Sequence, residues 1–433
     1  MRLSVNEEGN WRSFRHRNYQ ILFPANAVSN IGSWAQRIAQ DWLVLELTHS
    51  GTYLGLVTAL QFAPVLLFSL HGGALADRFN KRRVLIATNI AGGIASAILG
   101  ILVITNVVAL WHVFLLAFAL GVSTAIDGPV RQSFTTEVVG LEDLPNAVSL
   151  NSANFNAGRL VGPAVSGFLI AAFGTGPSFI FNALSYLFVI LALTQLNEKA
   201  FFTTEKSNSM TNVREGIAYV RARPDLYVVM AMVFFIATFG LNFQIFNALM
   251  ATKVFGKGPA SYGLLGTFIA IGSLSGALIS ARLESFRKSL FVVRAGMVFS
   301  IVVIILSVMP TYLAYAMWLP ICGLSALTTL ITANSIVQVN TDPAIRGRVM
   351  GLYLLIFMGG TPFGSPLIGV MAELIGTRQT IAACGAIAFL ATTVIYLKFK
   401  DRVGLPEDIS VGAVLQAADS DKNNKSDEGY KSN

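Results

Sequence analysis

The sequence predicts an all-α membrane protein with twelve transmembrane helices in two six-helix halves. Of its 433 residues, 54% are hydrophobic and only 12% are charged, which is about half the charged fraction of a soluble domain. The apolar residues fall in segments long enough to cross a bilayer, which takes about 20 residues. Basic residues gather in alternate connections between these segments. A surface this apolar needs lipid as its solvent.

The apolar segments follow one another along the whole chain. The first, at about residues 21–47, is longer than the roughly 7–15-residue core of a signal peptide, so we expect it to remain as a membrane helix. The twelve segments are centred near residues 34, 63, 95, 120, 160, 187, 238, 272, 300, 324, 360 and 389.

The basic residues predict the orientation. Those in the N-terminal arm and after segments two, six, eight and ten include Arg2, Arg12, Arg15, Arg17, Arg78, Lys81, Arg82, Arg83, Lys199, Lys206, Arg214, Arg221, Arg223, Arg282, Arg287, Lys288, Arg294, Arg346 and Arg348. The other connections carry only Lys253, Lys257 and Arg378. The positive-inside rule then places both termini in the cytoplasm of a multi-pass protein of the plasma (inner) membrane. Because the bases are spread between apolar segments, we expect no nucleic-acid partner.

Four regions are predicted along the chain. Val213, Ile217 and Val220 form an apolar edge beside charged residues, as in a helix lying on the membrane interface. Beyond Leu415 the sequence is polar and cannot bury a core. The predicted regions are an N-terminal six-helix bundle with a cytoplasmic arm (1–197), a cytoplasmic linker with an interfacial amphipathic helix (198–225), a C-terminal six-helix bundle (226–400) and a disordered cytoplasmic tail (401–433).

Segments five and eleven share a pattern of small residues and prolines, offset by about 202 residues. Glycines four apart let two helix backbones approach closely, and proline frees a carbonyl and bends a helix. Ordinary tight packing is one interpretation of any such pair, and a smooth seam between two moving halves is the other. The helix-packing residues are Gly158, Gly162, Pro163, Gly360, Gly364 and Pro366.

Four ionisable residues fall well inside predicted spans: Arg37, Asp41, Asp127 and Arg159. A charge at the bilayer centre costs a few kcal/mol, so each is expected to face a partner or a water-filled cavity. Arg37 and Asp41 are four residues apart and able to pair, as are Asp127 and Arg131. One interpretation is that each pair only locks helices together. The other is that one of the carboxylates takes up a proton when a central cavity opens to the other side of the membrane. We expect the four deep charges to handle proton coupling or substrate charge.

The second half offers neutral polar groups instead. We expect the substrate cavity to be lined by Trp34, Gln244, Asn247, Thr332 and Asn334. Glu46 and Glu373 lie near the outer membrane face and are expected to be solvated residues at its rim.

Enzymatic chemistry is not expected. Cys322 and Cys384 lie inside apolar segments, and the four histidines have no ligand spacing. The sequence contains no phosphate-cradling loop and no nucleophile elbow. We therefore predict no enzyme activity, no metal site and no cofactor.

The connection after segment two resembles the signature loop of the major facilitator superfamily. Gly73, Leu75, Asp77 and Arg78 match its pattern, and Asn80 stands where the family has a second glycine. Asparagine tolerates a left-handed backbone better than most residues. The resemblance implies that Asp77 contacts the start of helix eleven, whose N-terminus attracts a carboxylate, and locks the outward-facing state. The cytoplasmic gate it implies consists of Gly73, Asp77, Arg78, Arg82 and Arg131.

Further blocks resemble the enterobactin-exporter-like and multidrug-efflux branch of that superfamily. They include Asp41-Trp42, Asp127–Gln132, Leu144–Ala147, Arg159–Pro163, Glu215–Val220 and Gly364–Pro366. The resemblance implies proton-coupled export of a small amphipathic molecule, drug-like or siderophore-like, by alternating access. We expect a monomer whose partners are this substrate and the lipid bilayer, with the proton gradient as its energy source. The alternatives are an importer or a lipid or lysolipid flippase of the same fold, and a non-transporting membrane sensor or secretion partner.

Overall fold

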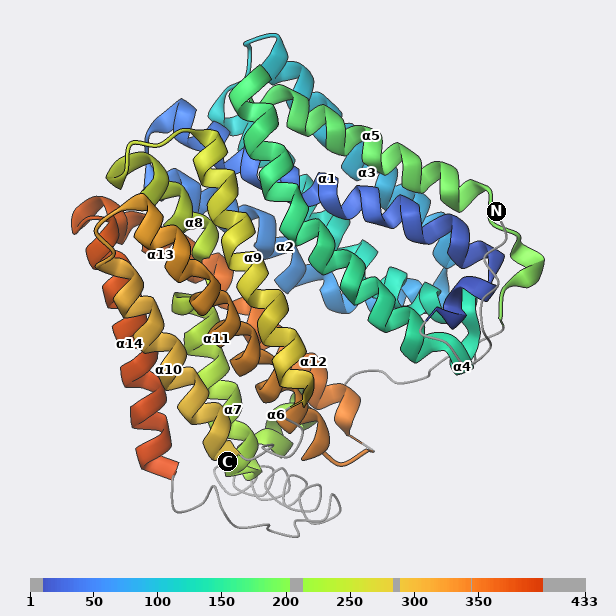
Figure 1. The fold of residues 1–433 in the computed structure, drawn as a ribbon. Helices are drawn as coiled ribbons and strands as arrows, with labels where there is room; N and C mark the ends of the chain where they lie inside the picture. The colour runs from blue at the N-terminus through green and yellow to red at the C-terminus, as the bar shows by residue number, and fades with distance from the viewer. Residues whose placement is uncertain (1–10, 203–212, 283–288, 344, 400–433) are drawn as a thin grey trace, which may run out of the picture.

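The structure is a computed structural model that describes residues 11–202, 213–282, 289–343 and 345–399, except for the side chains of 69–78, 213–214, 281–282 and 289. The predicted tail, 401–433, lies outside the described residues. The regular structure of the described ranges is helical, and Figure 1 shows its course. The first half contains η1 (Arg12–Arg15), α1 (Arg17–Thr48), α2 (Gly51–Arg78), α3 (Lys81–Ile104), α4 (Leu110–Phe173), α5 (Gly176–Thr194) and η2 (Glu198–Ala200).

A short helix, α6 (Val213–Ala222), occupies the place of the predicted amphipathic helix between the halves. Pro224 then begins the next helix, since the first turn of a helix needs no proline N–H. The second half contains α7 (Pro224–Phe235), η3 (Ile236–Gly240), α8 (Phe243–Leu249), η4 (Met250–Val254), α9 (Pro259–Arg282), α10 (Ser289–Ser307), α11 (Tyr312–Val339), α12 (Arg346–Gly359), α13 (Thr361–Leu374) and α14 (Thr377–Phe399).

Ten helical segments of the described chain are long and apolar enough to cross a membrane. One of them, α4, has 64 residues and at 1.5 Å per residue is about three times as long as the hydrocarbon core is thick. It makes two passes because Gly140 bends it with φ 75° and ψ 170°, a backbone conformation that glycine adopts without strain. Helix α1 has the length but is less apolar, because it carries Arg37 and Asp41. With α1 and both passes of α4, the described chain has the twelve membrane helices predicted.

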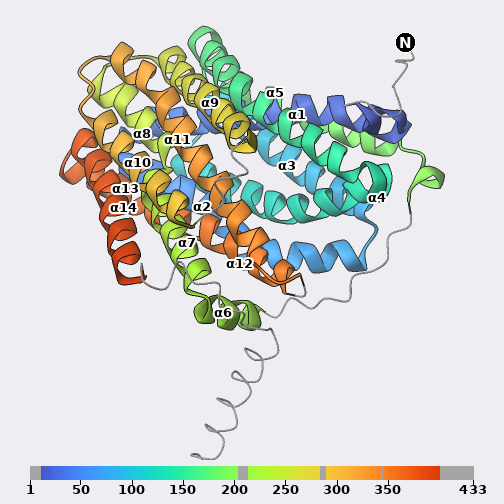
Figure 2. The same cartoon turned by 60° about the horizontal axis from the view of Figure 1, so that its bottom comes forward.

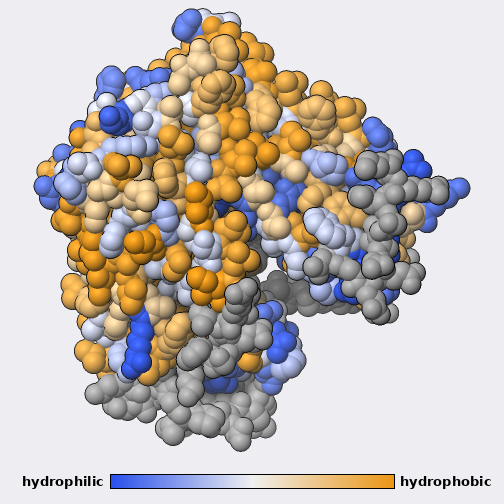
Figure 3. Space-filling model, in the orientation of Figure 1, coloured by the Kyte–Doolittle hydropathy of each residue, from blue (hydrophilic) through white to orange (hydrophobic). Residues whose placement is uncertain are grey.

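The helices form two bundles that touch at one end. In Figures 1 and 2, helices α1, α3 and α5 run together and lie apart from α7, α10 and α14. We call the end of the molecule that holds the start of α1 and the connection from α2 to α3 the basic end. The end that holds the connection from α1 to α2 is called the opposite end. At the opposite end, the carboxylate of Glu373 in α13 accepts hydrogen bonds from the hydroxyl (2.7 Å) and backbone N–H (3.1 Å) of Thr52 in α2. Toward the basic end the molecule is hollowed between the bundles (Figure 3).

Close backbone approach seals the seam at the opposite end. A Cβ atom on Gly55 of α2 would lie 2.9 Å from the Cα of Pro366 in α13. A Cβ atom on Gly266 of α9 would lie 2.8 Å from the Cβ of Pro163 in α4. Both predicted prolines therefore lie where the two halves meet, against glycines of the other half.

The predicted glycine pairs pack inside each half. A Cβ atom on Gly158 or Gly162 would lie within 2.7 Å of Asn30 or Trp34 in α1. Gly364, and likewise Gly360, faces Thr238 of η3, where a Cβ atom on Gly364 would lie 2.9 Å from the threonine methyl group. These pairs hold helices of one half together, which is the packing role that such pairs favour.

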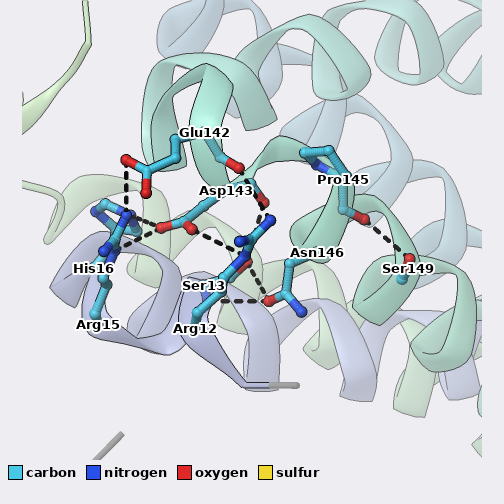
Figure 4. Close-up of polar contacts among 9 residues, drawn as sticks. All are labelled: Arg12, Ser13, Arg15, His16, Glu142, Asp143, Pro145, Asn146 and Ser149. Atoms are coloured by element: carbon cyan, nitrogen blue, oxygen red, sulfur yellow. Dashed lines mark hydrogen bonds and ion pairs between the residues drawn. The ribbon is translucent and has the colours of Figure 1, made fainter. Parts of the chain in front are cut away.

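The N-terminal arm is clamped to the bend in α4 (Figure 4). The buried carboxylate of Asp143 accepts hydrogen bonds from Arg15 and His16, each at 2.7 Å, and pairs with Arg12 at 3.3 Å. The bond to Asp143 raises the pKa of the Arg15 guanidinium further above its ordinary value. The hydroxyl of Ser13 donates to the side chain of Asn146 at 2.7 Å. This clamp fixes the start of α1 against the connection between the two passes of α4.

The clamp yields a stability prediction. We expect Asp143→Asn to lower the apparent thermal unfolding midpoint in detergent by about 5 °C, because it leaves cations facing a site with no anion. Glu142→Gln is the matched control: Glu142 is 78% exposed and pairs only at the surface with Arg15, and such pairs contribute little. Equal midpoints for the two variants would contradict the clamp.

Candidate functional site in the membrane centre

Two arginines of the first half lie beside one indole ring. The guanidinium carbon of Arg37 lies 5.0 Å from the centre of the Trp34 ring, and that of Arg159 lies 5.7 Å from it. Trp34 and Arg37 come from α1, whereas Arg159 comes from the second pass of α4. The ring of Phe155 meets Trp34 edge-on at 5.7 Å. Three of the predicted site residues therefore lie together, and each of them is partly exposed.

Arg37 and Asp41, which their spacing makes able to pair, form no direct ion pair among the described residues, although the two charges still attract each other. Asp41 is 4% exposed, and its carboxylate accepts a hydrogen bond of 2.8 Å from the hydroxyl of Tyr262. Tyr262 belongs to α9 of the other half and also stacks on Trp42. Spacing along α1 permits the Arg37 pair, but the arginine side chain lies over Trp34 and Phe62 instead. The Asp41 bond therefore joins the two halves.

Asp127 lies in a different environment, inside the first half. Its carboxylate accepts two hydrogen bonds from Arg131, at 2.7 and 3.0 Å, and one each from Thr88 and Asn89. Arg131 also donates to Asn26 of α1 at 2.5 Å. The pair that the four-residue spacing allows does form here. Because its charge is matched and its partners come from α1, α3 and α4, it joins helices of one half.

The polar residues of the second half divide into two groups. Asn247 is 2% exposed and accepts a hydrogen bond of 2.9 Å from Tyr315, and the buried hydroxyl of Thr332 donates to its own helix at Thr328. These two are turned to the interior of their bundle in this conformation, contrary to the expectation that they line the cavity. Gln244 and Asn334 are partly exposed.

The predicted gate is only partly described. Gly73, Asp77 and Arg78 lie at the end of α2, and their side chains are outside the described residues. Arg82 donates to the carbonyls of Leu193 (2.6 Å) and Thr194 (2.7 Å) at the end of α5, and it pairs with Glu198. Arg82, like Arg131, therefore contacts its own half here rather than the seam.

Asn80 does not have the backbone conformation expected at this loop. Its backbone is extended, with φ −63° and ψ 112°, rather than left-handed. Its side chain caps α3 by accepting from the N–H of Arg83 at 3.1 Å. Asparagine is among the preferred residues at such a cap because its short side chain reaches the free N–H groups of the first turn.

Tyr262 and Glu373 make contacts across the seam that sequence reasoning missed. Glu373 is exposed, as expected of a rim residue, and it also accepts hydrogen bonds from Thr52 and Ser50 at the start of α2. A helix N-terminus offers free N–H groups to a carboxylate, so this contact fastens α13 to α2 across the seam. Their partners lie 221 and about 320 residues away along the chain, and no local spacing signals contacts of that separation.

Comparison of the sequence with known proteins finds relatives that match most of the chain. The Staphyloferrin A transporter of Staphylococcus aureus is 24% identical and covers 87% of this chain and 95% of its own. The multidrug efflux pump Tap of Mycolicibacterium fortuitum is 27% identical, over 84% of this chain and 91% of its own. The enterobactin exporter EntS of Salmonella typhimurium is 23% identical, over 88% and 91%.

Solved structures share the fold. A bacterial homologue of the human lysosomal transporter Spinster, in an inward-facing and unoccupied conformation, superposes with a TM-score of 0.70 at 16% identity, over 90% of this chain and 98% of its own. A D-xylose–proton symporter gives 0.69 at 12% identity, over 87% and 97%. The family model described as transmembrane secretion effector matches residues 8–429. The relatives of this chain are membrane transporters rather than enzymes, and the family match along almost the whole chain shows that it belongs to this family of the major facilitator superfamily.

Proposed function

We propose that this protein exports small amphipathic molecules by proton-coupled alternating access. The observation that carries the proposal is the Asp41–Tyr262 hydrogen bond, which joins the halves on the sealed side of the cavity. The charge bias of the connections supports placing the basic end in the cytoplasm. In that orientation the hollow between the halves opens inward (Figure 3), ready to take a substrate from the cytoplasm.

Asp41 is the residue we assign to proton coupling. An ionised carboxylate accepts a stronger hydrogen bond than a protonated one, about 1.5–3 kcal/mol against about 0.5–1.5 kcal/mol. While Asp41 is ionised, its bond to Tyr262 keeps the outer seam closed, so the empty protein does not cycle. Either a proton on Asp41 or a bound substrate releases this bond, so the halves carry substrate outward and return inward with a proton. Asp127 is the less suitable candidate, because Arg131 already matches its charge within one half.

Other features complete the proposal. The two six-helix bundles act as the moving bodies, and the linker with α6 joins them on the cytoplasmic side. The Glu373 contact with α2 closes the outer side, and the Gly73, Asp77 and Arg78 segment closes the inner side in the alternate state. The protein works as a monomer in the plasma membrane with no cofactor, because the proton gradient supplies the energy.

The flux experiment uses inside-out membrane vesicles. A mixture of siderophores and toxic amphipathic compounds is added, and mass spectrometry measures what the vesicles accumulate when they are energised. The proposal expects at least one compound to accumulate only with the protein present, and a protonophore to abolish this. Accumulation only in right-side-out vesicles would indicate import, transfer of a lipid alone would indicate a flippase, and no accumulation in either would overturn transport.

A further inference from the structure

We infer that Arg37, Trp34 and Arg159 form an anion-binding subsite, and that the transported molecule carries at least one carboxylate. The inference rests on the proposed function for its place in transport, but the binding chemistry stands on the geometry. It narrows the substrate from any amphipathic molecule to an acidic one.

The two guanidinium groups face one small region from two helices. Both lie within 6 Å of the centre of the Trp34 ring, so their carbon atoms are no more than about 11 Å apart. Helices α1 and α4 approach each other closely at Gly162, because a Cβ atom there would lie 2.5 Å from the Cβ atom of Trp34. A single molecule with one or two acidic groups can therefore reach both arginines.

The donors of these arginines are available. A guanidinium has five N–H donors, yet neither Arg37 nor Arg159 forms a hydrogen bond or an ion pair with any described residue, and their protein contacts are the faces of aromatic rings. Arg131 differs, since Asp127 and Asn26 occupy its donors. Both side chains are partly exposed rather than buried, so their free donors reach the surface of the protein.

The charge balance of the region is positive. The acid nearest along α1 is Asp41, whose carboxylate is hydrogen-bonded to Tyr262 of the other half and also attracts Arg37, so two guanidinium groups face a single carboxylate. Two cations this deep in a membrane are costly unless an anion or water faces them. A carboxylate matches the planar fork of a guanidinium, so it would offset that cost better than a neutral group, and a cation would be repelled.

Aromatic rings beside the two arginines can contact the apolar part of a ligand. Phe155 is 49% exposed beside Trp34, and Phe62 lies beside Arg37. These rings give an apolar wall next to the two cations. The site therefore suits a molecule with an acidic group on an apolar or aromatic body.

The test compares three probes that share one aromatic body: naphthylacetate, its neutral amide, and the cation naphthylethylamine. Equilibrium binding is measured to the full chain in nanodiscs of zwitterionic lipid, with empty nanodiscs as the blank. We expect naphthylacetate to bind at least about tenfold more tightly than the other two. Arg37→Gln and Arg159→Gln should each remove this preference and leave binding of the amide unchanged.

Arg378→Gln is the matched control, because Arg378 also lies over an aromatic ring, at 5.5 Å from Phe255, but far from the subsite and already bonded to Ser307. It should bind naphthylacetate like the unmodified chain. Arg37→Lys and Arg159→Lys keep the charge and serve where a glutamine variant does not fold. Equal binding of the three probes, no binding of naphthylacetate above the blank, or an unchanged preference in both glutamine variants would overturn the subsite.

The flux experiment and the binding test can give different answers. Charge-selective binding without proton-driven accumulation would overturn the proposed exporter and leave the subsite. Proton-driven accumulation without charge-selective binding would overturn the subsite alone.

Discussion

Replacing Asp41 by asparagine is expected to abolish uphill transport while downhill transport continues. The asparagine cannot ionise, so the strong bond that holds Tyr262 in the empty protein is lost at every pH. The asparagine keeps at most a neutral bond, and a loss of about 1–1.5 kcal/mol corresponds to roughly a fivefold to tenfold shift between the two conformations. Energised vesicles should therefore accumulate no substrate, whereas exchange of substrate down its gradient persists.

Two further variants make this result specific. Tyr262→Phe removes the other partner and should uncouple transport in the same way. Glu46 is an exposed acid on the same helix, and among the described residues it hydrogen-bonds only to Trp42. The Glu46→Gln variant should therefore transport like the unmodified protein. If Asp41→Asn accumulates substrate with an unchanged rate and pH dependence, Asp41 is not the coupling residue.

Gly55→Val is expected to lower transport at least about tenfold by holding the outer seam open. A Cβ atom at this position would lie 2.7 Å from the carbonyl carbon of Ser365 and 2.9 Å from the Cα of Pro366. Both are backbone atoms of α13, which cannot rotate away as a side chain can, so the closed state takes the overpacking penalty of about 1–3 kcal/mol or more. The open outer state has no such contact and becomes the favoured one.

A valine of equal size elsewhere controls for the helix propensity of the substitution. A Cβ atom on Gly351 of α12 would meet nothing within 4 Å, so Gly351→Val should leave flux within about twofold of normal. Flux in vesicles measures both. Similar losses in the two variants would show that valine harms the helices generally and would contradict the assignment of the seam.

Sequence reasoning reached the architecture because its causes are local. Long apolar segments and alternating basic connections determine which residues cross the membrane, and glycines four apart pack against neighbouring helices as their spacing indicates. The Asp127–Arg131 pair was predictable for the same reason, since both residues lie on one face of one helix.

The candidate site was predictable only in composition. Arg37, Asp41, Arg159 and Trp34 were identified because charges inside a membrane are costly. Which of them pair could not be read from spacing, because Asp41 has two possible partners and the tertiary one, Tyr262, is 221 residues away. Asn247 likewise resembled a cavity residue until its bond to Tyr315 placed it in the interior of the second bundle.

The most direct test of the central claim is a distance measurement across the two ends of the protein at two pH values. Val107 and Leu313 are exposed at the opposite end, and Leu141 and Val339 at the basic end. Spin labels on cysteines at each pair report the two openings, and the native Cys322 and Cys384 are buried. At alkaline pH we predict a short distance for the first pair and a long one for the second. Acidification should lengthen the first and shorten the second, and Asp41→Asn should give the same mixture at both pH values. Distances that do not change with pH in the unmodified protein, or a pH response that survives in Asp41→Asn, would contradict the account.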